Sequence, residues 1–198
     1  MTAMMPNFYF DIEVRGSHRE GFGSACVGAV TQAMARMHPI FKEHADTYAI
    51  DLPGLSEGPR LDRRLGHQLR VFAQERASAN ALADTLDADE RLRDLVIIGR
   101  VRMIDTAAHA GPWAVLRRFR VAKRSEPLNR QRDLARAANL PFLMTRSRTN
   151  GHAYTLTLYR EIVQQRGAPV NGQPNSYGLS GEVPVMLPVI EATAMPFG

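Results

Sequence analysis

The feature of this sequence that most constrains its fold is a change of hydrophobic period near the N-terminus. Residues 7–15, NFYFDIEVR, alternate apolar and polar side chains, which predicts a half-buried β-strand. Residues 25–37 have the helical period, and Ser24 is placed to cap that helix. The apolar stripe of the helix consists of Val27, Val30, Met34 and Met37. The fold is therefore predicted to begin with a strand and an amphipathic helix.

The same patterns continue to residue 104. Further strands are predicted at 47–52, 67–73 and 94–104, and a second helix at 78–92. The order β-α-β-β-α-β is the ferredoxin-like arrangement, which RNA-recognition domains share with many unrelated proteins. We therefore expect an α+β protein whose residues 1–108 form a ferredoxin-like domain.

Residues 109–198 predict a second, smaller α+β domain. Residues 113–123 alternate as a strand, and a proline-led helix is predicted at 126–138. Residues 141–160 form two apolar alternating runs around a polar, glycine-containing turn, which predicts a β-hairpin. A glycine turn and a last strand are expected within 176–190.

Positive charge is concentrated in one part of the chain. Residues 1–99 hold 11 basic and 14 acidic side chains, whereas residues 100–148 hold 12 basic and 3 acidic ones. Of the 25 basic residues, 23 are arginine, whose guanidinium group binds phosphate bidentately and stacks on bases. The basic block therefore indicates a phosphate-binding surface, with nucleic acid as the expected partner.

Two sets of arginines in this block are candidate RNA contacts. Arg118 and Arg120 project from one face of the predicted strand, while Arg117 falls on its apolar face. Such a pair suits base or phosphate recognition, but an edge strand protected by charge has the same pattern. The second set lies on one arc of the predicted helix and includes Arg130, Arg132 and Arg136. A solvated helix face gives the same arc, but its position after an arginine-bearing strand favours a groove for an RNA duplex.

The mouth of the predicted hairpin contains Arg146, Ser147, Arg148 and Thr149. A solvated turn is one interpretation. The other is chemical, because an RNA strand is cut without metal when its 2′-hydroxyl attacks the adjacent phosphate. That reaction needs a base, a positioning hydroxyl and cations, and the mouth offers the last two.

The sequence offers little for other chemistries. The six histidines and the single cysteine, Cys26, show no metal-ligand spacing, and no phosphate-loop or dinucleotide motif is present. We therefore expect no metal and no cofactor. No apolar run approaches the roughly 20 residues of a membrane span, and no signal peptide is seen. A cytoplasmic location without membrane contact is expected.

Six motifs follow one another along the chain: FYFDIEVR, CVGAVTQAM, YAIDLPGL, RLGHQLRVFA, LPFLMTRSRTNGHAYTLTLYR and YGLS. In this order and spacing they resemble the CRISPR repeat-RNA-processing endoribonuclease of type I-F systems, or its type IV relative. The resemblance is strongest at 139–160 and 177–180. It implies a ferredoxin-like domain, a second domain with an arginine-bearing helix, and metal-independent cleavage beneath the repeat hairpin, with the product retained.

The resemblance also implies roles for single residues. Ser147 matches the serine that positions the 2′-hydroxyl, and Tyr177 matches the active-site tyrosine. Tyr154 matches the aromatic residue that stacks on the terminal base pair of the stem. Arg118 matches an arginine that reads a base near the foot of the stem, whereas Arg120 stands where the family usually has glutamine.

The helix at 126–138 matches the family's arginine-rich helix for the major groove, but it is much shorter. The arginines of this region are Arg124, Arg130, Arg132 and Arg136. A smaller footprint or a different stem is therefore expected.

The general base is the main departure from the family pattern. The family's histidine lies in the first helix, and aligning GAVTQAM puts Thr31 at that position. His38 lies seven residues further, about two turns along the same helical face, although Pro39 biases it away from a helical conformation. His18, in the loop before the helix, is the other candidate. Loss or slowing of cleavage is the remaining possibility.

We therefore expect a CRISPR RNA-processing endoribonuclease that binds the repeat stem-loop and cuts at its 3′ base. It would stay bound as a subunit of an effector complex, with the other subunits as partners. A non-catalytic repeat-hairpin-binding subunit of such a complex is the alternative. A generic RNA-recognition-like module is the third hypothesis.

Overall fold

The first sheet has the strand order of the predicted fold. The computed structural model describes residues 4–16, 23–59, 64–121, 126–146, 151–165, 167 and 169–190. Its first elements are β1 (Phe8–Val14), α1 (Gly23–Glu43), β2 (Tyr48–Asp51), β3 (Gln68–Ala73), α2 (Arg76–Asp87), α3 (Glu90–Arg93), β4 (Val96–Ile98) and β5 (Arg102–Met103). These strands form an antiparallel sheet in the order β2-β3-β1-β4, with β5 also paired to β1. The α+β, ferredoxin-like arrangement is thereby confirmed.

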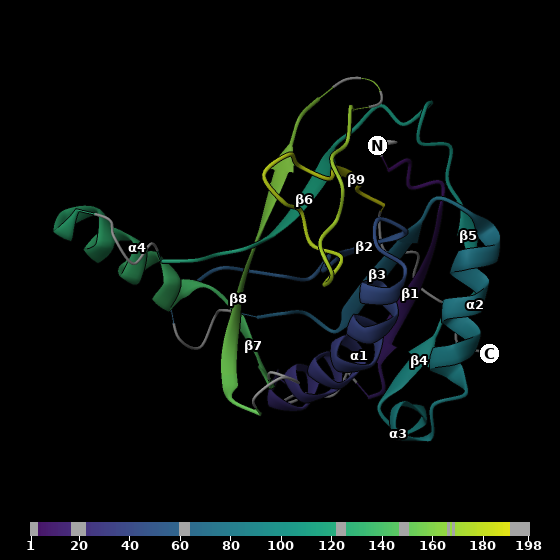
Figure 1. Ribbon diagram of the computed structural model, residues 1–198, viewed down its shortest axis with the longest axis horizontal. Helices are drawn as coiled ribbons and strands as arrows, with labels where there is room; N and C mark the ends of the chain where they lie inside the picture. The colour runs from purple at the N-terminus through teal and green to yellow at the C-terminus, as the bar shows by residue number, and fades with distance from the viewer. Residues whose placement is uncertain are drawn as a thin grey trace.

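The helices α1 and α2 lie side by side along this sheet (Figure 1). The stripe predicted for α1 is part of the core, with Val30, Met34 and Met37 buried against β1 and its neighbours. α1 also continues past Pro39 to Glu43, so the expectation that the proline turns His38 away from the helix was wrong. The extension buries Phe41, which is 3 % exposed, and this apolar burial favours the extra turn.

Two predicted elements are interrupted. The helix expected at 78–92 ends at Asp87, and α3 starts after Asp89, whose side chain accepts a hydrogen bond from the Arg91 backbone nitrogen. The strand expected at 94–104 is broken between β4 and β5 at Gly99. A Cβ atom there would lie 3.0 Å from the Asp11 backbone oxygen, a tight contact, so the close approach of β1 favours glycine.

The other face of the first sheet is covered rather than solvated. Tyr9 and Phe72 pack there with Val185 and Leu187 from the C-terminal segment. Tyr9, predicted on the polar face of its strand, is consequently 6 % exposed. The period-2 pattern of β1 identified the sheet face that the helices cover. It did not indicate that the C-terminal segment covers the opposite face.

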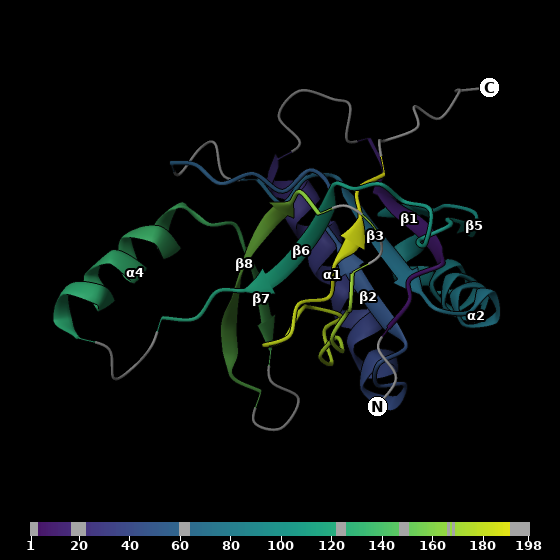
Figure 2. The same cartoon turned by 90° about the horizontal axis from the view of Figure 1, so that it is seen from above.

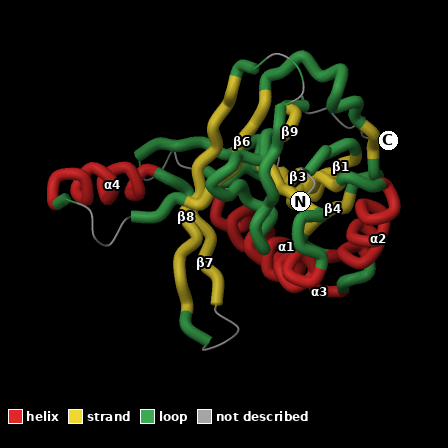
Figure 3. The backbone as a smooth tube through the Cα atoms, turned by 45° about the horizontal axis from the view of Figure 1, so that its top comes forward, coloured by secondary structure: helices red, strands yellow, loops and turns green. Residues whose placement is uncertain are grey.

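The second sheet contains the predicted hairpin. Its elements are β6 (Trp113–Arg118), β7 (Phe142–Arg146), β8 (Ala153–Val163) and β9 (Leu187–Pro188), in the antiparallel order β7-β8-β6-β9. Helix α4 (Pro127–Asn139) is inserted between β6 and β7 and stands away from the rest of the molecule in two orthogonal views (Figures 1 and 2). The β7–β8 hairpin lies beside α1 and projects from the body of the molecule (Figure 3).

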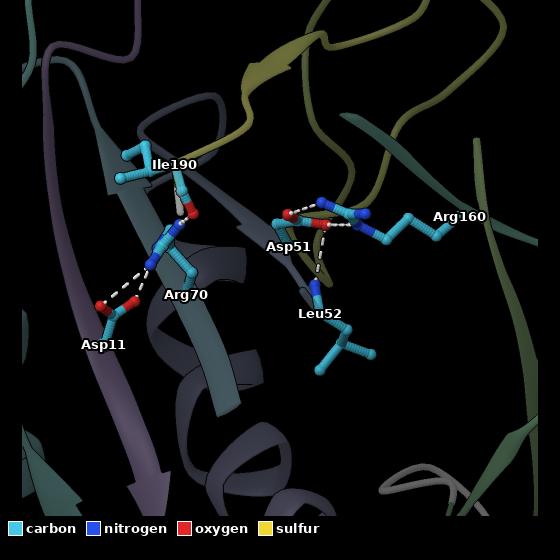
Figure 4. A network of polar contacts seen from close by, with 6 residues as sticks. All are labelled: Asp11, Asp51, Leu52, Arg70, Arg160 and Ile190. Carbon is cyan, nitrogen blue, oxygen red and sulfur yellow. Dashed lines mark hydrogen bonds and ion pairs between the residues drawn. The ribbon is translucent and has the colours of Figure 1, made fainter. Parts of the chain in front are cut away.

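The two sheets share a core and are joined by buried charges. Leu116, Leu143 and Leu156 of the second sheet belong to the same apolar cluster as α1 and β1. Asp51 of β2 accepts hydrogen bonds from Nε and Nη2 of Arg160 on β8, at 2.7 and 2.8 Å (Figure 4). Because the core is continuous, the predicted division at residues 108 and 109 stays a prediction.

Candidate functional site

A pocket of about 320 Å³ lies between α1 and the β7–β8 hairpin. Helix α1 contributes Thr31, Met34 and His38, and the hairpin contributes Leu143. Tyr177, in the loop before β9, also lines the pocket. The pocket therefore brings together the first helix, the hairpin and the YGLS motif, which are far apart in the sequence. We call it the histidine pocket.

His38 is held in one orientation by two contacts. Its Nδ1 lies 2.6 Å from the backbone oxygen of Ser176. Because a carbonyl oxygen only accepts, Nδ1 carries the hydrogen, which leaves Nε2 as the acceptor of the neutral ring. The imidazole also stacks on the Tyr177 ring, with centroids 4.0 Å apart and planes 3° apart. A neutral histidine fixed in this way can take a proton through Nε2.

Tyr177 is the centre of a polar cluster. Its hydroxyl is hydrogen-bonded to the hydroxyl of Tyr154 on β8. Partial burial, followed by this hydrogen bond, raises the pKa of Tyr177 from its ordinary value of 10.0 to about 12, while the Arg118 charge acts in the opposite direction. Tyr177 is therefore protonated at neutral pH, and its hydroxyl is available as a hydrogen-bond donor but not as a base. The Arg118 guanidinium lies 5.7 Å from the centre of the Tyr154 ring.

A second pocket, of about 470 Å³, shares Tyr177 with the histidine pocket, and we call it the arginine pocket. Arg117, Arg118 and Arg120 all line it. Arg117 keeps the strand register that alternation predicts, opposite Tyr159, and its Nη1 donates to the backbone oxygen of Gly181 at 3.0 Å. Among the described residues, the Nε atoms of Arg117 and Arg118 are buried without a hydrogen-bond partner.

The arginine-bearing helix α4 presents its side chains to solvent. No residue of α4 is buried, and Arg130 and Arg132 are exposed. The Arg136 guanidinium lies 5.3 Å from the Phe119 ring centre and 5.1 Å from that of Tyr159. Arg136 therefore also anchors α4 to the second sheet through cation–π contacts.

The structure does not place all the predicted site residues. Arg146 ends β7, where it pairs with Ala153. Thr31 lines the histidine pocket, but its hydroxyl donates to the Val27 backbone oxygen at 2.7 Å. The predicted residues outside the described part of the chain are His18, Arg124, Ser147, Arg148 and Thr149.

Sequence reasoning missed two contributors to the site. Ser176 acts through its backbone oxygen, which no side-chain pattern can indicate. Alternation placed Arg117 on the apolar side of its strand and gave no sign that its guanidinium group would donate to the backbone of Gly181 and line a pocket. In the described ranges, no group of three or more His, Cys, Asp or Glu side chains is arranged to hold a metal ion. No helix there is long and apolar enough to cross a membrane.

These features define a class: an α+β, ferredoxin-like protein with a histidine–tyrosine pocket beside an arginine-lined one. Residues 9–189 match the family model described as CRISPR-associated protein (Cas_Csy4), and the chain therefore belongs to that family. It is a CRISPR-associated repeat-processing protein, a nuclease by class that binds CRISPR repeat RNA. The family expected from the motifs is thereby confirmed, while the choice between type I-F and type IV stays a prediction. No curated protein matches the chain.

Proposed function

We propose that this protein cuts the repeat RNA at the 3′ base of its stem-loop without a metal ion and stays bound as a subunit of an effector complex. The observation that carries the proposal is the placement of His38. It lies two turns along α1 from Thr31, reaches the same pocket, and is oriented by Ser176 and Tyr177. His38 thus supplies a base close to the position at which the family has its histidine.

In the proposed reaction, Nε2 of His38 takes the proton of the 2′-hydroxyl, and the 2′-oxygen attacks the adjacent phosphorus. The bond from phosphorus to the 5′-oxygen breaks, and that oxygen takes a proton from water. The upstream product ends in a cyclic phosphate and the downstream product in a 5′-hydroxyl. Ser147 holds the attacking oxygen in line. Arg146 and Arg148 neutralise the phosphate, and the uncharged Thr149 hydroxyl donates a hydrogen bond to it.

Binding is assigned to groups that the fold leaves accessible. We propose that Tyr154 stacks on the terminal base pair, that Arg118 and Arg120 contact bases near the foot of the stem, and that α4 lies along the groove. These contacts hold the stem while the histidine pocket receives the strand to be cut.

Cleavage of the cognate repeat in EDTA tests the proposal. We expect a single cut, with a cyclic phosphate or its hydrolysed form on one product and a 5′-hydroxyl on the other. Replacing the attacking 2′-hydroxyl by hydrogen should abolish cutting and leave binding nearly intact. A requirement for Mg²⁺ would overturn the mechanism.

The assignment of His38 as the general base is tested by a separate variant. His38→Ala should slow single-turnover cleavage by roughly 10²–10⁴-fold, the range for loss of a general base. His44→Ala, which removes an exposed histidine just after α1, is the matched control and should leave the rate unchanged. A reduction of less than about threefold on His38→Ala would reject His38 and direct attention to His18.

A second candidate function, binding without cleavage, is favoured by one observation. Thr31 occupies the family's histidine position, and its hydroxyl is engaged within α1. Tight binding of the repeat with no cut by the wild-type protein would establish this function instead.

A further inference from the structure

Two arginines that line the arginine pocket each have a buried donor that the described residues leave without a partner. Nearly all buried polar groups in folded proteins are hydrogen-bonded, so an unpaired buried donor calls for an explanation. In the described part of the chain, the Nε atoms of Arg117 and Arg118 have no such partner. The two side chains are half-buried, so a ligand in the pocket meets the remaining part of each guanidinium group, whose planar fork suits the paired oxygens of a phosphate.

The pocket is preformed rather than a gap in a loose loop. The Asn175 side-chain oxygen accepts hydrogen bonds from the backbone nitrogens of Tyr177 and Leu179, at 2.9 and 3.3 Å. The Ser180 backbone nitrogen donates to the Leu116 backbone oxygen at 2.9 Å, which ties the loop to β6. A volume of about 470 Å³ falls in the range of small-ligand sites, and the Tyr177 and Tyr159 side chains add aromatic surface.

The arginine pocket lies next to the histidine pocket, and this position indicates which part of the RNA it binds. Tyr177 lines both pockets, and Ser176 lines the arginine pocket while its backbone oxygen holds His38. The two pockets therefore adjoin, and an RNA strand with its scissile phosphate by His38 can extend its next nucleotide into the arginine pocket. For a cut at the 3′ base of a stem, the upstream neighbour is base-paired, so the unpaired neighbour is the downstream one.

We infer that the arginine pocket binds the unpaired nucleotide that follows the scissile phosphate, with the 3′ phosphate of that nucleotide on Arg117, while Arg118 keeps its proposed contact with the stem. The inference rests on the proposed function, because it takes the position of the cut from it. It gives Arg117 a role in substrate recognition and makes the single-stranded flank of the repeat part of the recognised substrate. Recognition then extends one nucleotide beyond the stem.

Two uncleavable stem-loops test the inference by binding alone. Both carry a 2′-deoxy group at the cut position. One ends in a phosphate at the scissile position, and the other continues by one unpaired nucleotide with its own 3′ phosphate. Wild-type protein should bind the longer RNA about tenfold more tightly, the gain of one charge-assisted contact.

Arg117→Lys keeps the charge but removes the planar guanidinium fork, so the gain from the extra nucleotide should fall to about threefold or less while affinity for the shorter RNA is kept. Arg91→Lys, at an exposed position of α3, is the matched control and should keep the full gain. Equal binding of the two RNAs by the wild type would overturn the inference without reference to any variant. Equal weakening of both RNAs by Arg117→Lys would also overturn it.

The two proposals can fail separately. These affinities are measured on RNA that cannot be cut, so they do not depend on His38. Loss of cleavage with the tenfold gain intact would remove the catalytic proposal and leave the nucleotide subsite.

Discussion

Arg70 in the first sheet and Arg118 at the end of β6 both have a buried Nε atom, but their hydrogen bonds differ. Arg70 donates through Nε and Nη2 to Asp11 and through Nη1 to the Ile190 backbone oxygen (Figure 4). Arg160 is likewise paired with the buried Asp51. Arg118 contacts the Tyr154 ring, and its Nε has no partner in the described residues. The difference separates arginines that hold the fold from arginines left for a ligand.

The largest effect on stability should follow from breaking a pair that holds the fold. Asp51→Ala leaves Arg160 without its carboxylate and should lower the free energy of unfolding by about 3–5 kcal/mol, because the remaining charge is only slightly exposed. Chemical denaturation measures it. Arg36→Ala breaks the more exposed pair with Asp89 and should cost about 1 kcal/mol or less. Equal destabilisation of the two variants would contradict the comparison.

Tyr154 is assigned to RNA binding rather than to holding the fold. Tyr154→Ala should weaken stem-loop binding by roughly 1–3 kcal/mol, the range for removing one base stack, while changing the free energy of unfolding much less. Titration of a fluorescent stem-loop and denaturation of the same sample give both values. If the variant unfolds instead, Tyr154 is a core residue and its assignment to RNA is wrong.

The arginines of helix α4 test the RNA-binding assignment through the salt dependence of the affinity. Arg132→Ala with Arg136→Ala should lower the slope of log affinity against log salt by about 0.9 for each phosphate that α4 no longer neutralises. Arg136 also packs on two aromatic rings, so the single variants should be unequal, with Arg132→Ala sparing stability. An unchanged salt slope would remove α4 from the RNA surface.

The smallest expected effect is on stability at alkaline pH, and it involves Tyr177. Its raised pKa means that the folded state binds the phenol proton more tightly than the unfolded state does. This contribution to stability is complete below about pH 10 and is lost as the pH rises towards about 12. Tyr177→Phe should therefore reduce the alkaline loss of stability, measured as thermal midpoints at about pH 8 and about pH 11. Identical alkaline losses in the two proteins would contradict the assigned shift.

Much of the fold followed from local pattern, because periodicity reports which face of an element is buried. Periodicity placed β1, the α1 stripe and the β7–β8 hairpin. It did not predict the features that depend on contacts between distant parts of the chain. Pro39 lies inside α1 because Phe41 is buried beyond it, and Tyr9 is covered by a segment more than half the chain away.

The site was less predictable for the same physical reason. Residue types pointed to Tyr177 and Arg118 through the family resemblance, and the helical repeat put His38 on the Thr31 face. The orientation of His38 depends on a backbone oxygen of Ser176, 138 positions away, and the hydrogen bond of Arg117 is to the backbone oxygen of Gly181, 64 positions away. Long-range contacts of this kind leave no local signal.

The central claim is that unpartnered arginines bind RNA and partnered arginines hold the fold. It is tested most directly by measuring unfolding free energy and stem-loop affinity on Arg118→Gln and Arg70→Gln. Arg118→Gln should weaken binding about tenfold or more, with its stability unchanged or raised, because it removes an unpaired buried donor. Arg70→Gln should lower stability and leave the affinity of the folded protein unchanged. If Arg118→Gln is destabilised as much as Arg70→Gln and still binds RNA normally, the account is wrong.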